Sequence, residues 1–131
     1  MADTTTTIGR EKYKMTITSS KGNTLIADEP HNLGGKDLGF SPFELLASSL
    51  GACTSATLRM YADRKKWDLE EVNTRVSVER DDAADRTTFI RHIELKGDLS
   101  QEQCARLIEI GEKCPVHRLL NGKIDIETIA N

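Results

Sequence analysis

Three cysteines are the side chains of this sequence with the widest scope for chemistry. Cys53 lies in a stretch without charged residues, Cys104 lies in a predicted helix, and Cys114 directly precedes Pro115. A thiolate is a nucleophile and a metal ligand, whereas a buried free cysteine often packs as a small apolar residue. Each cysteine therefore has a chemical and a structural interpretation, and the surrounding elements decide between them.

Cys114 has the setting that most favours a reactive thiol. Proline is preferred at the first position of a helix, so Pro115 predicts a short helix over residues 115–120 with Cys114 at its N-cap. Unpaired backbone N–H groups and the positive end of the helix dipole stabilise a thiolate at this position. His117 and Arg118 follow within one turn. The structural alternative is that Cys114 is simply a small polar cap.

Cys53 and Cys104 are more ambiguous from their neighbours alone. Cys53 shares a helical stripe with Leu46, Leu50 and Met60, so packing in a core is its simpler interpretation. Cys104 has no reactive residue beside it, and we expect it to be structural.

The element that must position Cys53 is a long helix over residues 42–65. Ser41 suits the N-cap, Pro42 the first helical position, and Glu44 the third, where it completes a capping box. No charged residue lies between Glu44 and Arg59, so the helix is predicted to be covered on most sides. Glu44 has a second interpretation, as a carboxylate that orients a cation or a substrate oxygen near Cys53.

The remaining pattern predicts an α+β chain with antiparallel hairpins. We expect a single domain over residues 1–131, in which residues 1–8 form a frayed leader. The other predicted elements are strands at 13–17, 24–27, 72–79 and 89–96, a helix at 100–113 and a terminal strand around 124–129.

Composition excludes several classes of protein. The chain has 131 residues, 18 basic against 21 acidic side chains and a net charge of −3, which argues against a nucleic-acid binder. No uncharged run reaches the ~20 residues that span a bilayer, and we expect no export signal. An odd number of cysteines argues against a disulfide framework and predicts a cytoplasmic protein.

The sequence gives only weak support to a metal site and to a phosphate site. Cys114 and His117 have metal-ligand spacing, and His31 and Cys53 could complete a zinc site, but no second close pair is present, so no metal is predicted. The glycine-rich segment 34–39 precedes a helix but lacks the spacing of a phosphate-binding loop.

Two motifs together resemble the OsmC/Ohr superfamily, the osmotically inducible protein C and organic hydroperoxide resistance proteins. The first is SPFELLASSLGACT at residues 41–54, and the second is CPVHRLL at residues 114–120. Residues 32–40 and 58–65 also look like the OsmC-like branch. The resemblance extends over nearly the whole chain, from about Arg10 onward.

The resemblance implies both a fold and an activity. The implied fold is an intertwined α+β homodimer whose buried cysteine-bearing helix lies centrally between curved antiparallel sheets. The implied activity is that of a thiol peroxidase for hydroperoxides, organic ones above all, in oxidative-stress defence. By analogy, Cys53 becomes a sulfenic acid, Cys114 resolves it to a disulfide, and a dithiol reductant reopens it without a metal or organic cofactor.

The sequence departs from the family pattern at one position. In the peroxidases a glutamate ten residues before the reactive cysteine pairs with an arginine from the N-terminal strand region. Here Phe43 occupies that position, Glu44 lies nine residues before Cys53, and the candidate cations are Arg10, Lys12 and Lys14. This departure keeps a second function open: a non-enzymatic dimeric module that binds a small molecule, with Cys53 as packing.

Overall fold

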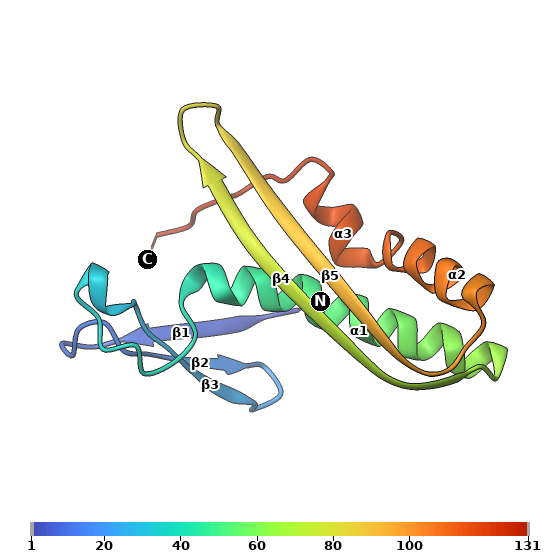
Figure 1. The fold of residues 1–131 in the computed structure, drawn as a ribbon. Helices are drawn as coiled ribbons and strands as arrows, with labels where there is room; N and C mark the ends of the chain where they lie inside the picture. Colours follow the sequence, from blue (N-terminus) through green and yellow to red (C-terminus); the bar gives the residue numbers. More distant parts are fainter. Residues whose placement is uncertain (1, 131) are drawn as a thin grey trace. The chain divides into compact units, whose positions relative to one another are not determined.

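The computed structural model describes residues 2–130, which divide into two compact units between Leu46 and Ala47. The division falls inside the long helix α1 (Pro42–Lys65), which has the predicted bounds. Figure 1 shows the helices and strands with their labels.

A three-stranded antiparallel sheet forms the first unit. Its strands are β1 (Thr4–Ile8), β2 (Met15–Ser19) and β3 (Thr24–Ala27), in the order β1-β2-β3. The predicted β2–β3 hairpin is confirmed, with Met15 opposite Ala27. The prediction that residues 1–8 fray is wrong for Thr4–Ile8, which pairs with β2 along its whole length. A run of β-branched threonines favours an extended strand even where every side chain is exposed.

A buried carboxylate organises the loop after β3. Asp28 is 1% exposed and accepts hydrogen bonds from the backbone N–H groups of four residues, which are Tyr13, Glu29, Lys36 and Leu38. The short helix η1 (His31–Leu33) lies within this loop. A side chain at Gly35 would collide with the carbonyl oxygen of Glu29 at 1.9 Å, so this tight path requires glycine. Because Lys36 and Leu38 donate to Asp28, their N–H groups are not available to cradle a phosphate.

Helix α1 begins as predicted. The Ser41 side chain accepts a hydrogen bond from the N–H of Glu44, and the Glu44 carboxylate accepts one from the N–H of Ser41. This reciprocal pair is the capping box, and it satisfies two donors that the helix itself leaves unpaired.

A long hairpin forms the sheet of the second unit. Strands β4 (Asp68–Asp81) and β5 (Arg86–Asp98) pair antiparallel, with Val72 opposite Leu95 and Thr74 opposite Ile93. Both predicted strands are confirmed and extend several residues further at each end. Figure 1 shows them as two long curved ribbons that lie side by side and are joined by a loop.

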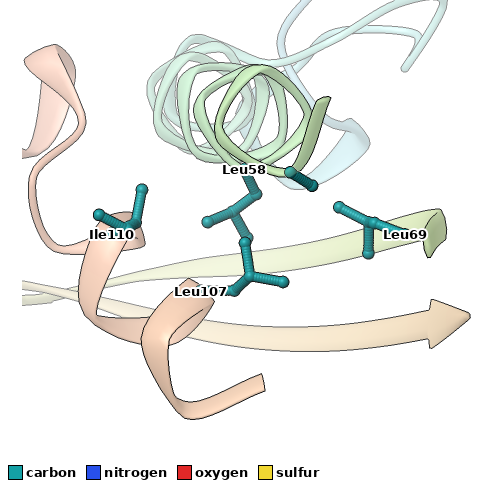
Figure 2. Close-up of a cluster of buried hydrophobic side chains, with 5 residues drawn as sticks. Leu58, Leu69, Leu107 and Ile110 are labelled. Atoms are coloured by element: carbon teal, nitrogen blue, oxygen red, sulfur yellow. The ribbon is translucent and has the colours of Figure 1, made fainter. Parts of the chain in front are cut away.

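Two helices follow the hairpin. Helix α2 (Gln101–Gly111) begins with the predicted capping box of Ser100 and Gln103, and α3 (Pro115–Leu120) begins at the predicted proline. The core joins α1, β4 and α2, as Figure 2 shows, through Leu58, Leu69, Leu107 and Ile110.

The predicted terminal strand is wrong. Residues 123–130 form no helix or strand, and Ile126 and Ile129 are 89% and 85% exposed. Their alternation is imperfect, and no described strand pairs with them, so apolar residues alone do not make a strand there. The α+β class with antiparallel sheets is nevertheless confirmed.

Candidate functional site

Cys114 occupies the predicted N-cap of α3. Its backbone is extended, with φ −65° and ψ 145°, and its Sγ accepts a hydrogen bond from the N–H of His117 at 3.4 Å. The residue is fully buried. Pro115 fixes the first helical position and needs no hydrogen-bond acceptor, so within residues 2–130 the cap is made by the N–H of His117 alone.

Helix α1 brings Thr54, the residue after Cys53, against this sulfur. The Thr54 Oγ1 lies 3.8 Å from the Cys114 Sγ, and both residues have no exposed surface. Cys53 itself is half-buried. Successive side chains on a helix differ in direction by ~100°, so Cys53 leaves the helix in another direction from Thr54. The structure thus places Cys114 beside the helical turn that carries Cys53, with both cysteines as free thiols.

A buried arginine joins the elements around Cys114. The Arg91 side chain, from β5, is 10% exposed. Its Nη1 donates to Thr54 Oγ1 at 3.0 Å and to the carbonyl oxygen of Gly111 at 3.3 Å. Its Nη2 lies 3.1 Å from His117 Nδ1 and 3.4 Å from the Glu112 carboxylate. One side chain therefore contacts α1, the end of α2 and α3.

The contact with Arg91 fixes the tautomer of His117. A guanidinium can only donate, so His117 Nδ1 must accept, and a neutral ring then carries its proton on Nε2. That nitrogen lies 3.4 Å from the Glu112 carboxylate. Arg91, Glu112 and His117 therefore contact one another pairwise and form a polar cluster, the Arg91 cluster, beside the buried Cys114.

Sequence reasoning missed Arg91, Thr54 and Glu112. The sequence did mark Arg91 as unusual. The alternation along the strand places it on the same face as the apolar residues Phe89, Ile93 and Leu95. A single cation on an otherwise apolar strand face must find buried partners. Thr54 and Glu112 left no such sign, since nothing in their own segments predicts that they meet across the fold.

Glu44 lies at the first turn of α1, with its carboxylate in the capping box. Across residues 2–130 the structure records no ion pair for Glu44, nor one for Arg10, Lys12 or Lys14. The capping interpretation is thus confirmed, and the orientation of a cation stays a prediction.

Cys104 lies in the first turns of α2 and is half-buried. Among residues 2–130, the Cys104 side chain takes part in none of the hydrogen bonds recorded for Cys114 and Arg91. Its position agrees with a structural role.

An open hollow of about 360 Å³ lies over α1 and β4 in the second unit. Small residues line it, among them Gly51, Ala52 and Ser55 of α1 and Thr74 and Val76 of β4. Two of the lining residues, Ser55 and Thr74, form a hydrogen bond of 2.8 Å between their hydroxyl groups.

In the described part of the chain, no three His, Cys, Asp or Glu side chains gather closely enough to hold a metal ion. No helix within residues 2–130 combines the length and apolarity that crossing a membrane requires.

Solved structures with the same fold come from several bacteria. A protein from Psychrobacter arcticus, described as a putative osmotic stress induced and detoxification response protein, has a TM-score of 0.79 at 21% identity, over 91% of this chain and 88% of that one. An OsmC-like protein from Mycoplasma pneumoniae has a TM-score of 0.78 at 24% identity, over 93% and 88%. An organic hydroperoxide resistance protein OsmC from Legionella pneumophila has a TM-score of 0.70 at 24% identity, over 95% and 92%.

A search of curated proteins finds no match. Membership of a family is shown by a family model instead. The family model described as "OsmC-like protein" matches residues 34–129, a segment that contains Cys53, Cys114 and the whole Arg91 cluster. The chain therefore belongs to the OsmC-like protein family.

Proposed function

We propose that this protein is a thiol peroxidase that reduces hydroperoxides, organic ones by preference, in oxidative-stress defence. The observation that carries the proposal is the contact of the buried Cys114 Sγ with Thr54, the neighbour of Cys53. This contact supports the proposal because Thr54 follows Cys53 directly on α1. The similarity of the fold to an organic hydroperoxide resistance protein from Legionella pneumophila supports it as well.

The reaction proceeds in two thiol steps. The Cys53 thiolate attacks the hydroxyl oxygen of the hydroperoxide, the O–O bond breaks, and Cys53 becomes a sulfenic acid. The alkoxide that leaves takes up a proton from water and becomes an alcohol. Cys114 then attacks the oxidised sulfur, and a disulfide forms with loss of water. A dithiol reductant reopens that disulfide by thiol exchange and takes up the two oxidising equivalents.

The test is the fate of each thiol after one equivalent of cumene hydroperoxide. We expect Cys53 to be linked to Cys114 in the peptide map, with Cys104 free. Cys114→Ser should accumulate a dimedone-reactive sulfenic acid on Cys53, because no thiol remains to resolve it. Cys104→Ser is the matched control and should behave as wild type. A major disulfide that contains Cys104 would falsify the assignment.

The second candidate function is the binding of a small molecule without chemistry. The hollow over α1 and β4 favours it, since its volume falls within the range of ligand sites. Under this alternative, Cys53 stays reduced in excess hydroperoxide. Oxidation of Cys53 at a rate that depends on the hydroperoxide concentration excludes it.

The proposed active form is a homodimer. The stretch from Leu45 to Leu58 has no charged residue, yet Ala52 and Ala56 are exposed, and Met60 just beyond is 64% exposed. A partner subunit would cover this face, as the family resemblance implies. Sedimentation at micromolar concentration should give about twice the chain mass of 14.6 kDa, and a stable monomer would contradict the proposal.

A further inference from the structure

Arg91 contacts each helix that surrounds Cys114 but has no recorded hydrogen bond to Cys53 within residues 2–130. A guanidinium that is only 10% exposed is costly to bury unless its N–H groups are paired. Its hydrogen-bond and ion-pair partners are side chains or helix ends next to Cys114. Arg91 therefore contacts the surroundings of Cys114 rather than Cys53 itself.

We propose that Arg91 is a positioning residue for Cys114, which holds its sulfur in place for the attack on oxidised Cys53. The inference rests on the proposed function and concerns its second step alone. Arg91 acts through Thr54, whose oxygen accepts from Nη1 and lies beside the sulfur, and through His117, whose N–H donates to the sulfur.

The step that Arg91 serves is the condensation of a thiol with a sulfenic acid. The Cys114 Sγ attacks the Cys53 sulfur, an S–S bond forms and the S–O bond of the sulfenic acid breaks. The hydroxide that leaves takes the proton that Cys114 loses, and the product is water. No further oxidant is needed, because the sulfenic acid already holds both oxidising equivalents.

The Thr54 hydroxyl links the arginine to this proton loss. It has one proton and two candidate acceptors, the Leu50 carbonyl oxygen at 2.7 Å and the Cys114 Sγ at 3.8 Å. While Cys114 is a thiol, its own proton can point to the Thr54 oxygen. Once that proton leaves, the hydroxyl can turn to the sulfur, while Arg91 keeps its oxygen fixed.

The experiment separates the two steps in a Cys104→Ser background. One equivalent of cumene hydroperoxide is added, and Cys53 thiol loss and disulfide formation are followed by quenched mass spectrometry. For Arg91→Gln we expect thiol loss within about twofold of wild type but disulfide formation at least about tenfold slower, because a misplaced attacking group loses its geometric advantage. The sulfenic acid should therefore accumulate and be trapped by dimedone.

Two variants serve as controls for charge and for anchoring. Arg91→Lys keeps the charge but cannot span the partners of a forked guanidinium, so disulfide formation should fall between wild type and Arg91→Gln. Arg106 also joins α2 to α1, through the Tyr61 hydroxyl at 3.1 Å. Among residues 2–130 its other recorded side-chain hydrogen bond is to Glu109, and neither partner is one of the residues that contact Arg91. Arg106→Gln should leave both steps at the wild-type rate.

A second pair of variants tests the same path should Arg91→Gln fold poorly. Thr54→Val removes the hydroxyl at nearly constant volume, and Thr54→Ser restores it. We expect slow disulfide formation only in Thr54→Val.

Two outcomes would overturn the inference about Arg91, and a third would contradict the proposed function. Wild-type disulfide formation in both Arg91→Gln and Thr54→Val overturns the inference, and so does an equal slowing of both steps, which indicates general destabilisation. Failure of the wild-type protein to link Cys53 with Cys114 contradicts the proposed function instead.

Discussion

The two compact units are organised around buried groups of opposite character. In Met1–Leu46 the buried carboxylate of Asp28 accepts only backbone N–H groups, most of them from its own loop. In Ala47–Asn131 a leucine cluster forms the core, and the buried cation Arg91 lies beside Cys114. The Asp28 carboxylate, paired with backbone N–H groups, joins parts of one loop. The Arg91 guanidinium, paired with side chains and a helix end, joins three helices around Cys114.

Two groups of residues in the second unit share α1 and α2 but have no member in common. One is the apolar core around Leu58 and Leu107, and the other is the set of residues that contact Arg91. Stability and thiol chemistry should therefore respond to different substitutions.

The largest effect should come from the apolar core. Leu107 has no exposed surface, and Leu107→Ala should lower the free energy of unfolding by about 2–5 kcal/mol through lost burial and a cavity. Trp67 packs against this core and, as the only tryptophan, reports its urea unfolding by fluorescence. Ile108 is the matched control: it is 41% exposed, and Ile108→Ala should cost less than about 1 kcal/mol. Equal losses would show that α2 does not bury the face described.

The first unit should respond to the loss of one carboxylate. Asp28→Asn replaces an acceptor by a side chain whose NH₂ group faces the backbone N–H groups of the loop. We expect the amide hydrogens that Asp28 pairs to exchange at least about tenfold faster, by NMR. The tryptophan-monitored transition of the second unit should be much less affected. Unchanged exchange would break the contrast between the two units.

The same carboxylate predicts a pH dependence. Burial raises the pKa of Asp28, but four backbone hydrogen bonds lower it, and the net pKa lies below its usual value. A lowered pKa in the folded state means that the stabilisation is complete above the unfolded value of about 3.9 and is lost as the pH falls through the folded pKa. Amide protection in the loop, taken relative to Asp28→Asn at each pH, should therefore disappear only below about pH 4.

Local patterns were sufficient to predict most elements of this fold. The capping boxes at Ser41 and Ser100, the proline after Cys114 and the alternation along β4 and β5 depend on near neighbours in the sequence, and each was confirmed. The prediction of a terminal strand was wrong because strand pairing depends on residues that are distant in the sequence. Isoleucines around Ile126 have the composition of a strand, but pairing requires a neighbour that the local sequence does not reveal.

The candidate site was predictable only in part. The N-cap position of Cys114 follows from Pro115, but its contact with Thr54 joins residues 60 positions apart in the sequence. The contacts of Arg91 depend equally on three helices that meet only after folding. Sequence alone could mark Arg91 as a cation on an apolar strand face, but could not name its partners.

The smallest effect is expected at Glu44, where the helix bearing Cys53 begins. Its carboxylate accepts the Ser41 N–H at 2.9 Å, and glutamine can accept the same hydrogen bond. Glu44→Gln should therefore lower the free energy of unfolding by no more than about 1 kcal/mol. The second-order rate of Cys53 oxidation by cumene hydroperoxide should change by less than about twofold, because the capping role does not involve the thiol.

A different outcome would change the comparison between the two units. If Glu44 organises a cation beside the reacting peroxide, neutralising it should slow Cys53 oxidation tenfold or more, equivalent to at least about 1.4 kcal/mol on the barrier. Glu44→Ala then serves as the reference, because it removes the cap as well as the charge and should lose more stability than Glu44→Gln. A large loss of rate in Glu44→Gln with an unchanged melting temperature would mean that the first unit contributes directly to the chemistry. The cation would then have to be sought among Arg10, Lys12 and Lys14, the basic residues that precede β2.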